Sequence, residues 1–450
     1  MGKLTRFQIQ KLYGYRNIDI PIIDNTAIFV GENGMGKTTI LKFMFSILSG
    51  AYHQIPSSIF DRIIVTINDK DFTITYDDVH KNYIKLNSRM LNELPSIFRR
   101  ELDLKKDLIS ITDLVNISEK YDYPLHRILD RLKRYEAMDE IDVKIHIDKE
   151  IVSSLNARIL YLPTYRRIEE DLEHVIKGRY SFSKEHENYN FNRFEDTNSY
   201  IELVEFGMQD VKEKIEKKCS ELSRYSESSF KDLAYMNLGD VIDKNYYSDN
   251  KPVTHEDIQK FQLCLSRNNK ERLSPDRVQS LISFLTEENF NPSDTHRQIL
   301  LYYFRNLLNL QEELEKKEQS IIDFCDICNQ YFKSSGKTMN YDISTFKVNI
   351  NKKHPNRTDI IDMGDLSSGE KQIVSLFSHL FLSEENNFFV IIDEPELSLS
   401  VPWQRTFLKD ILQSKKCIGL ISTTHSPFIY ADPTLFQYAR GLGEYIEEEN

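Results

Sequence analysis

The chain has 450 residues, of which 28% are charged and 40% hydrophobic, so it can bury a sizeable core and more than one domain is expected. Its formal net charge of −12 argues against a protein whose whole surface coats nucleic acid. With 5 scattered cysteines and no apolar run near the ~18 residues of a membrane span, we expect a cytoplasmic protein without disulfides or a membrane anchor.

The first part of the chain predicts strands around one helix. Residues 4–9 and 18–22 alternate about a turn, as in a hairpin, and the apolar run 26–30 predicts a strand buried on both faces. Residues 40–45 indicate a helix. Two further alternating runs, 63–67 and 72–76, predict a second hairpin and an antiparallel layer, which residues 143–147 are expected to join.

Residues 31–39, between that buried strand and the helix, fit the pattern G-x-x-x-x-G-K-[ST] of a phosphate-binding loop. Glycines let the backbone come close to an anion, and the amide N–H groups then face the phosphates at a helix N-terminus. Lys37 would reach the β- and γ-phosphates and Thr38 would ligate Mg²⁺. The alternative is a glycine-rich turn that binds no nucleotide. The residues predicted to bind nucleotide are Asn33, Gly34, Met35, Gly36, Lys37, Thr38 and Thr39.

Two groups of arginines leave alternatives open. Residues 159–162 predict a central strand that ends at a turn with Arg166 and Arg167, which would either contact the γ-phosphate or pair with the acidic residues 169–171. Arg127, Arg131 and Arg134 recur at helical spacing. A solvated helix face is the simpler interpretation, and a docking surface for an acidic partner, DNA or a protein that imitates it, is the alternative.

Residues 168–335 are almost wholly helical in pattern. An apolar stripe between residues 300 and 332 indicates a long hairpin or bundle helix, whose stripe is either core or an oligomerisation face. The polar stretches 220–228 and 268–274 are candidate breaks between helices. Cys325 and Cys328 form a lone C-x-x-C, for which buried thiols are favoured over a zinc site.

Strand patterns return after residue 345. Residues 346–350 alternate, and Leu-Ser-Ser-Gly-Glu at 366–370 opens a helix. Ser367 and Glu370 fit a capping box that needs no ligand. The alternative is that Ser368 and Gly369 leave the helix N-terminus open to a phosphate.

The apolar run 388–392 predicts a buried strand, and two carboxylates follow it directly. Asp393 would hold Mg²⁺, mostly through water, and Glu394 would polarise an attacking water. A last apolar run, 417–422, precedes His425, which is either a satisfied polar residue or a catalytic one.

In this order the segments resemble an ATP-binding-cassette ATPase of the Rad50/SMC/OLD group. The resemblance implies an α/β head, with a mixed sheet around the phosphate loop and an antiparallel layer, split into residues 1–167 and 336–450 by a helical insertion at 168–335. It implies ATP and Mg²⁺ as ligands, His425 as a γ-phosphate sensor in cis, and Ser367, Ser368 and Gly369 as contacts to nucleotide held by a second copy. No glutamine stands where the family's Q-loop is expected, so the residue that fills that role is left open.

A narrower resemblance is to ATPase subunits of bacterial anti-phage systems, AriA of PARIS or, less closely, PtuA of Septu. It is carried by residues 161–168, 203–211 and 394–400. It implies an ATP-driven sensor and scaffold that forms a homo-oligomer, in which dimers closed over ATP assemble into a hexamer. That assembly would hold a separate nuclease, of Toprim rather than HNH type, until a trigger such as a phage DNA mimic releases it. No nuclease domain is expected in residues 426–450. The alternative is a Rad50-like DNA-maintenance ATPase that binds DNA directly.

Overall fold

The computed structural model describes residues 2–32, 34–51, 55, 58–80, 83–85, 108–110, 146–163, 200–202, 208–246, 252–268, 274–286 and 294–449. The chain divides into two compact units. The first comprises Met1–Glu205 and Glu384–Asn450, and the second comprises Phe206–Ser383. Residues 336–383 therefore group with the helical segment.

One sheet of the first unit is antiparallel. Its strand order is β16-β2-β1-β4-β5, and the strands are β1 (Leu4–Leu12), β2 (Arg16–Pro21), β4 (Arg62–Ile67), β5 (Lys70–Thr75) and β16 (Ile446–Glu448). Both predicted hairpins, β1 with β2 and β4 with β5, are present. Their alternating burial shows one face turned to the core, as the sequence alternation indicated.

The second sheet of this unit is parallel, in the order β15-β3-β14-β13-β8-β9. Its strands are β3 (Thr26–Val30), β8 (Arg158–Leu162), β9 (Tyr200–Glu202), β13 (Phe388–Asp393), β14 (Cys417–Thr424) and β15 (Ala439–Gly441). Every residue of β13 is buried, because strands in the middle of a parallel sheet are covered on both faces. This explains why these strands read as continuous apolar runs.

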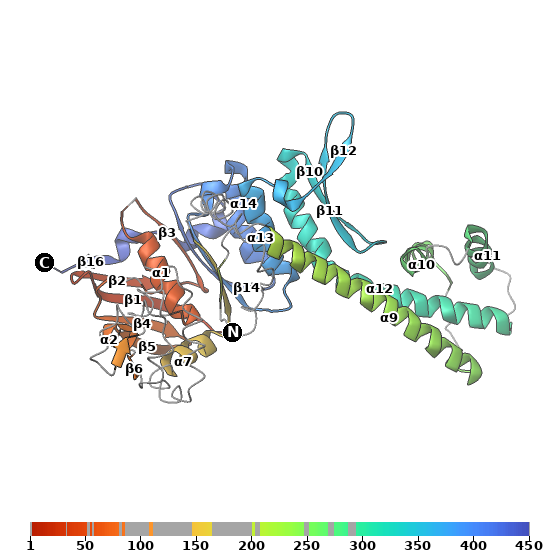
Figure 1. Cartoon of the computed structure of the whole chain (residues 1–450), viewed down its shortest axis with the longest axis horizontal. Coiled ribbons are helices and arrows are strands. Elements are labelled where there is room, and N and C mark those ends of the chain that lie inside the picture. The colour runs from red at the N-terminus through yellow and green to blue at the C-terminus, as the bar shows by residue number, and fades with distance from the viewer. Residues whose placement is uncertain are drawn as a thin grey trace, which may run out of the picture. The chain divides into compact units, whose positions relative to one another are not determined.

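Helix α1 (Lys37–Ser49) packs on the parallel sheet, and its apolar side chains belong to one core shared with the antiparallel sheet (Figure 1). The unit also contains α7 (His146–Leu155) and α14 (Val401–Gln413). Its shorter elements are α2 (Tyr76–His80), β6 (Tyr83–Lys85), β7 (Leu108–Ser110), and the 3₁₀ helices η5 (Pro395–Ser398), η6 (Pro433–Tyr438) and η7 (Leu442–Tyr445).

The strand predicted at 143–147 is wrong where the structure describes it. Residues 143–145 lie outside the described residues, and His146 begins α7. Ile151 and Leu155, one helical turn apart, are both fully buried. The helical spacing of apolar residues after residue 147 therefore determines the structure here. The short alternation of apolar and polar residues before it does not.

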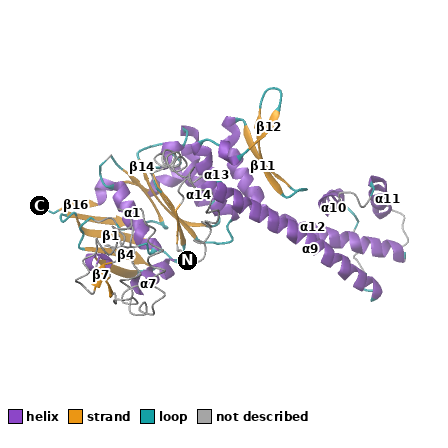
Figure 2. Cartoon of the chain, in the orientation of Figure 1, coloured by secondary structure: helices purple, strands orange, loops and turns teal. Residues whose placement is uncertain are grey.

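The second unit is built on two long helices, α9 (Gln209–Ile242) and α12 (Thr295–Phe332), which contact each other and α13 (Ser368–Leu382) (Figure 2). It also contains α10 (His255–Asn268), α11 (Pro275–Thr286), the 3₁₀ helices η3 (Lys333–Ser335) and η4 (Met363–Asp365), and an antiparallel sheet of β10 (Lys337–Asp342), β11 (Lys347–Lys353) and β12 (Thr358–Ile361). No helix among the described residues is both long and apolar enough to cross a membrane.

The helix break predicted at 220–228 is wrong, because α9 runs through it without interruption. Leu222 and Ser226 are buried within this stretch, so the helix is fixed by packing despite its polar composition. The apolar stripe of α12 lies mostly in the core of the unit, with both Cys325 and Cys328 buried. Burial raises the pKa of Cys325 to about 12, which keeps its thiol protonated at neutral pH.

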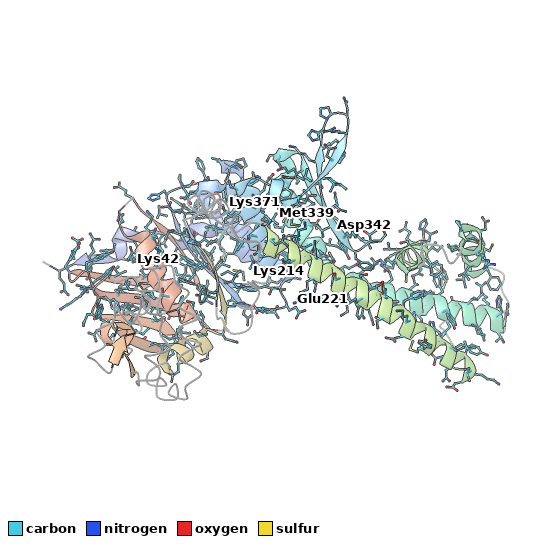
Figure 3. All side chains as sticks on the ribbon, in the orientation of Figure 1. Lys42, Lys214, Glu221, Met339, Asp342 and Lys371 are labelled. Atoms are coloured by element: carbon cyan, nitrogen blue, oxygen red, sulfur yellow. The ribbon has the colours of Figure 1, made fainter. Side chains whose placement is uncertain are left out.

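Side chains of α12 attach the three-stranded sheet to the long helices. The Asn329 amide donates to the carbonyl of Met339 (2.8 Å) and accepts from its N–H (2.7 Å), and Figure 3 shows Met339 on β10. Deeper in the unit, Glu318 accepts hydrogen bonds from Arg267 Nη2 of α10 and from the Tyr341 hydroxyl of β10, both at 2.8 Å. The buried carboxylate thus joins α10, α12 and β10.

Candidate active site

Three neighbouring strands of the parallel sheet end at one edge. In the pairing register, Val30 at the end of β3 lies beside Thr424 of β14, and Asp393 at the end of β13 lies beside Thr423 of β14. The phosphate loop follows β3, the two carboxylates come at the end of β13, and His425 follows β14. Because carboxyl ends of parallel strands meet at this edge, segments almost 400 residues apart in the sequence share one site.

The phosphate loop has the backbone that its glycines permit. Gly34 and Gly36 have φ angles of 84° and 88°, a conformation that L side chains rarely adopt. Gly36 is the N-cap of α1 and has no side chain with which to cap its first turn. The N–H groups at the start of the helix are thereby left for an anion, which the positive end of the helix dipole also favours.

Lys37 is only 5% exposed, although it carries the first helical position of α1. Its ammonium donates to the carbonyl oxygens of Gly31 (2.9 Å) and Glu32 (3.0 Å), and lies 2.6 Å from His425 Nε2. Burial lowers the pKa of Lys37, although Glu394 and two other carboxylates act against this. The side chain of Lys37 is therefore held within the loop and faces the end of β14.

Asp393 has a carboxylate that is only 1% exposed at the end of β13. Its Oδ1 accepts a hydrogen bond from the Thr423 hydroxyl of the neighbouring strand. A buried carboxylate at a strand end, within the electrostatic reach of Lys37, is a hard oxygen ligand of the kind that Mg²⁺ prefers. The Thr38 hydroxyl, half-buried in the first turn of α1, supplies a second oxygen of suitable chemistry. The residues present fit a magnesium ion.

Glu394 follows in a strained conformation, with φ at 47°, in the left-handed region that non-glycine residues rarely enter. Its N–H donates to the carbonyl oxygen (3.1 Å) and the hydroxyl oxygen (3.3 Å) of Thr423. Its Oε1 lies 3.4 Å from His425 Nε2. Burial raises the pKa of Glu394, and the adjacent Asp393 carboxylate raises it further. Strain and a raised pKa together are typical of a group that accepts protons in a reaction.

The structure brings together Lys37, Asp393, Glu394 and His425, all within the first unit. Gly34, Met35, Gly36, Thr38 and Thr39 follow one another in the same loop and helix start. Asn33 lies outside the described residues, as do Arg127, Arg131, Arg134, Arg166 and Arg167.

Ser367, Ser368 and Gly369 belong to the second unit. Ser367 caps α13 in the predicted capping box: its hydroxyl accepts from the Glu370 N–H (3.4 Å), and Glu370 Oε2 accepts from the Ser367 N–H (2.7 Å). Lys337 also donates to Glu370 (2.6 Å). Ser367 and Ser368 are exposed. The capping interpretation therefore holds, and the exposed serines leave the phosphate-binding alternative open.

Three residues near the site were missed by sequence reasoning. Thr423 supports both Asp393 and Glu394, as described above, while Glu396 and Gln404 contact the segment after β14. Thr423 could have been predicted from the sequence. It lies two residues before His425, so pairing the strands 388–393 and 417–424 in parallel places its hydroxyl beside Asp393. Glu396 and Gln404 carry no comparable signal.

A family model described as "AAA ATPase domain" matches residues 3–430. A curated relative, "Retron Vc95 probable ATPase" of Vibrio cholerae serotype O1 biovar El Tor, is 23% identical over 431 residues, which cover 91% of this chain and 67% of the relative.

Two solved structures are also similar to the chain. One is the Smc head domain with an extended coiled coil bound to the C-terminal domain of ScpA from Pyrococcus furiosus (14% identity, TM-score 0.33, covering 96% of this chain and 92% of that one). The other is the Smc head domain with a coiled coil and joint from Pyrococcus yayanosii (14% identity, TM-score 0.29, covering 96% and 93%).

Proposed function

Because this chain belongs to the AAA ATPase domain family, and so binds ATP, we propose that it hydrolyses ATP at the edge formed by β3, β14 and β13. One observation carries the proposal. His425 Nε2 lies between Lys37 Nζ (2.6 Å) and Glu394 Oε1 (3.4 Å), so the phosphate-binding lysine, the acidic base and the histidine face one another.

Each of these residues has a distinct role in the proposed reaction. Lys37 binds the β- and γ-phosphates and neutralises their charge, together with the N–H groups at the start of α1. Glu394 orients the attacking water and accepts its proton, a role for which its raised pKa suits it. His425 contacts both groups, so it senses whether a γ-phosphate occupies the site.

Thr38 and Asp393 are the residues that would hold Mg²⁺. When bound, the ion neutralises charge on the phosphate oxygens. Thr423 fixes the Asp393 carboxylate from the neighbouring strand, so the metal ligand is already oriented by the sheet.

Two copies of the chain would enclose each nucleotide, with Ser367, Ser368 and Gly369 of one copy closing over the phosphate loop of the other. The support is the start of α13, where both serines are exposed and the helix N-terminus favours an anion. ATP would then hold the dimer together, and hydrolysis would release it.

We further propose that the protein is the sensor and scaffold subunit of a bacterial anti-phage complex, holding a separate nuclease of Toprim type until an infection signal releases it. The support is the resemblance of residues 161–168 and 394–400 to such subunits, together with a relative described as a retron ATPase. The long helices α9 and α12 would supply the surface for further assembly, such as a hexamer, and for the nuclease.

Co-purification tests this role. The full-length protein is expressed with the product of the neighbouring open reading frame, with only one of the two carrying an affinity tag. We expect the tagged protein to retain a nuclease, at a fixed molar ratio that mass photometry measures. A trigger protein with an acidic, DNA-like surface should release the nuclease. A chain purified without any such partner from the natural host contradicts the scaffold role.

DNA binding separates this proposal from a DNA-maintenance ATPase. We expect weak binding of a duplex by fluorescence anisotropy, with little effect of ATP, because the chain has a net charge of −12. Tight binding that ATP strengthens and that falls steeply between about 50 and 200 mM salt would instead favour a DNA clamp.

A further inference from the structure

The segment that carries His425 is fixed by a residue outside the catalytic group. Glu396, in η5, directs one carboxylate oxygen at two consecutive N–H groups: its Oε1 accepts from His425 N (2.6 Å) and from Ser426 N (3.2 Å). The backbone at His425, immediately after β14 ends, is therefore anchored to η5.

A second anchor comes from α14. The Ser426 hydroxyl donates to Gln404 Oε1 (2.6 Å), and Gln404 Nε2 donates in turn to the carbonyl of Leu399 (2.9 Å). Gln404 is only 8% exposed, so this anchor is part of the packed structure. The segment after β14 is thus held on two sides, by η5 and by α14.

Only one oxygen of the Glu396 carboxylate has hydrogen-bond partners among the described residues. Its other oxygen, Oε2, is buried and has no hydrogen-bond partner among the described residues. Leaving a buried carboxylate oxygen unpaired costs free energy, which a neutral acceptor at the same place would reduce. A neutral acceptor of the same length could therefore make both contacts with the N–H groups without that cost.

We propose that Glu396 is a positioning residue that acts through His425, fixing its backbone so that Nε2 lies between Lys37 Nζ and Glu394 Oε1. This rests on the proposed ATPase function and adds to it a residue whose hydrogen bonds go to the backbone at His425 and Ser426. The contribution that we assign to Glu396 is an acceptor oxygen at the right distance from two N–H groups. Its charge also acts on Lys37 and Glu394, and a variant without that charge separates the two effects.

Two conservative variants separate reach from charge. Glu396→Gln keeps an acceptor oxygen at the same distance and loses the charge, whereas Glu396→Asp keeps the charge and is one methylene too short. We expect kcat for ATP hydrolysis to stay within about threefold of the unaltered protein in E396Q, and to fall about tenfold or more in E396D, because two N–H groups lose their partner. If E396D is as active as the unaltered protein, or if E396Q falls as far as E396D, the positioning role is wrong.

A double-mutant cycle with His425→Ala shows whether Glu396 acts through the histidine. In the H425A background, we expect E396D to change kcat by less than about twofold, because the group it positions is already gone. An equal loss in both backgrounds would mean an independent, merely structural effect and would overturn the proposal. Thermal unfolding of each variant identifies any that fail to fold, and the comparison of E396Q with E396D stands without the alanine background.

Glu150→Asp is the matched control, since Glu150 is an exposed carboxylate of the same unit that pairs with Lys70 (2.9 Å). It should leave kcat unchanged. If the unaltered protein does not hydrolyse ATP, the proposed function fails; if it does and the cycle is additive, only the role of Glu396 fails.

Discussion

Glu394→Gln should lower kcat for ATP hydrolysis by about a hundredfold or more while leaving ATP binding intact. The amide cannot accept a proton from water, and a positioned base contributes roughly 10²–10⁴-fold to such reactions. The substitution keeps the size of the side chain, so the contact with His425 and the strained backbone at this position are retained. Phosphate release in a single turnover measures the chemical step, and equilibrium dialysis with labelled ATP measures binding.

Lys37→Ala gives the complementary result, a loss of both binding and hydrolysis, because the ammonium that neutralises the phosphates is removed. Lys42→Ala is the matched control on the same helix, labelled in Figure 3. It should behave as the unaltered protein, and EDTA should abolish hydrolysis in every variant. Turnover at an unchanged rate in either E394Q or K37A would remove the site assignment.

Glu318→Ala should destabilise the second unit by about 3–5 kcal/mol, the range measured when one partner of a buried ion pair is removed. The side chains of Arg267 and Glu318 are 0% and 1% exposed, and two of the guanidinium nitrogens, Nε and Nη1, already have no hydrogen-bond partner within the described part of the chain. The variant would leave the guanidinium buried without its carboxylate partner. It would also remove the acceptor of the Tyr341 hydroxyl, whose pKa is raised by burial and by the Glu318 carboxylate.

Glu312→Ala is the control for this stability prediction. Glu312 lies on the same helix and pairs with Lys260 of the same α10, but its side chain is 51% exposed, so its loss should cost less than about 1 kcal/mol. Differential scanning calorimetry of the full chain follows the transition of the second unit. Equal shifts for both variants would show that the buried pair adds nothing beyond a surface one.

The strands around the site could be predicted because their signals are local. The apolar runs that became β3 and β13, and the alternation of β1 and β2, follow directly from burial on two faces or one. Their adjacency was not local. Lys37 was predicted from the phosphate-loop pattern, Asp393 from the carboxylates that follow an apolar run, and the sensor role of His425 from the resemblance to ATP-binding-cassette ATPases.

Other features depend on packing that a pattern does not show. The stretch 220–228 looks like a break, yet Leu222 and Ser226 are buried inside α9. Glu396 accepts hydrogen bonds from backbone N–H groups almost 30 residues later. Every residue other than proline has such a group, so the identity of the donor residues does not predict the contact. The role of Ser367, the partners and the oligomer stay predictions, since they depend on a second copy or on other proteins.

The most direct test of the account is a structure of the Glu394→Gln protein crystallised with ATP and Mg²⁺. We predict that the γ-phosphate lies against Lys37 Nζ and the N–H groups that open α1, with the metal ion between Thr38 and Asp393 and with His425 facing the γ-phosphate. Nucleotide bound elsewhere on the chain, or an edge of β3, β14 and β13 that stays without nucleotide at saturating ATP, would contradict it.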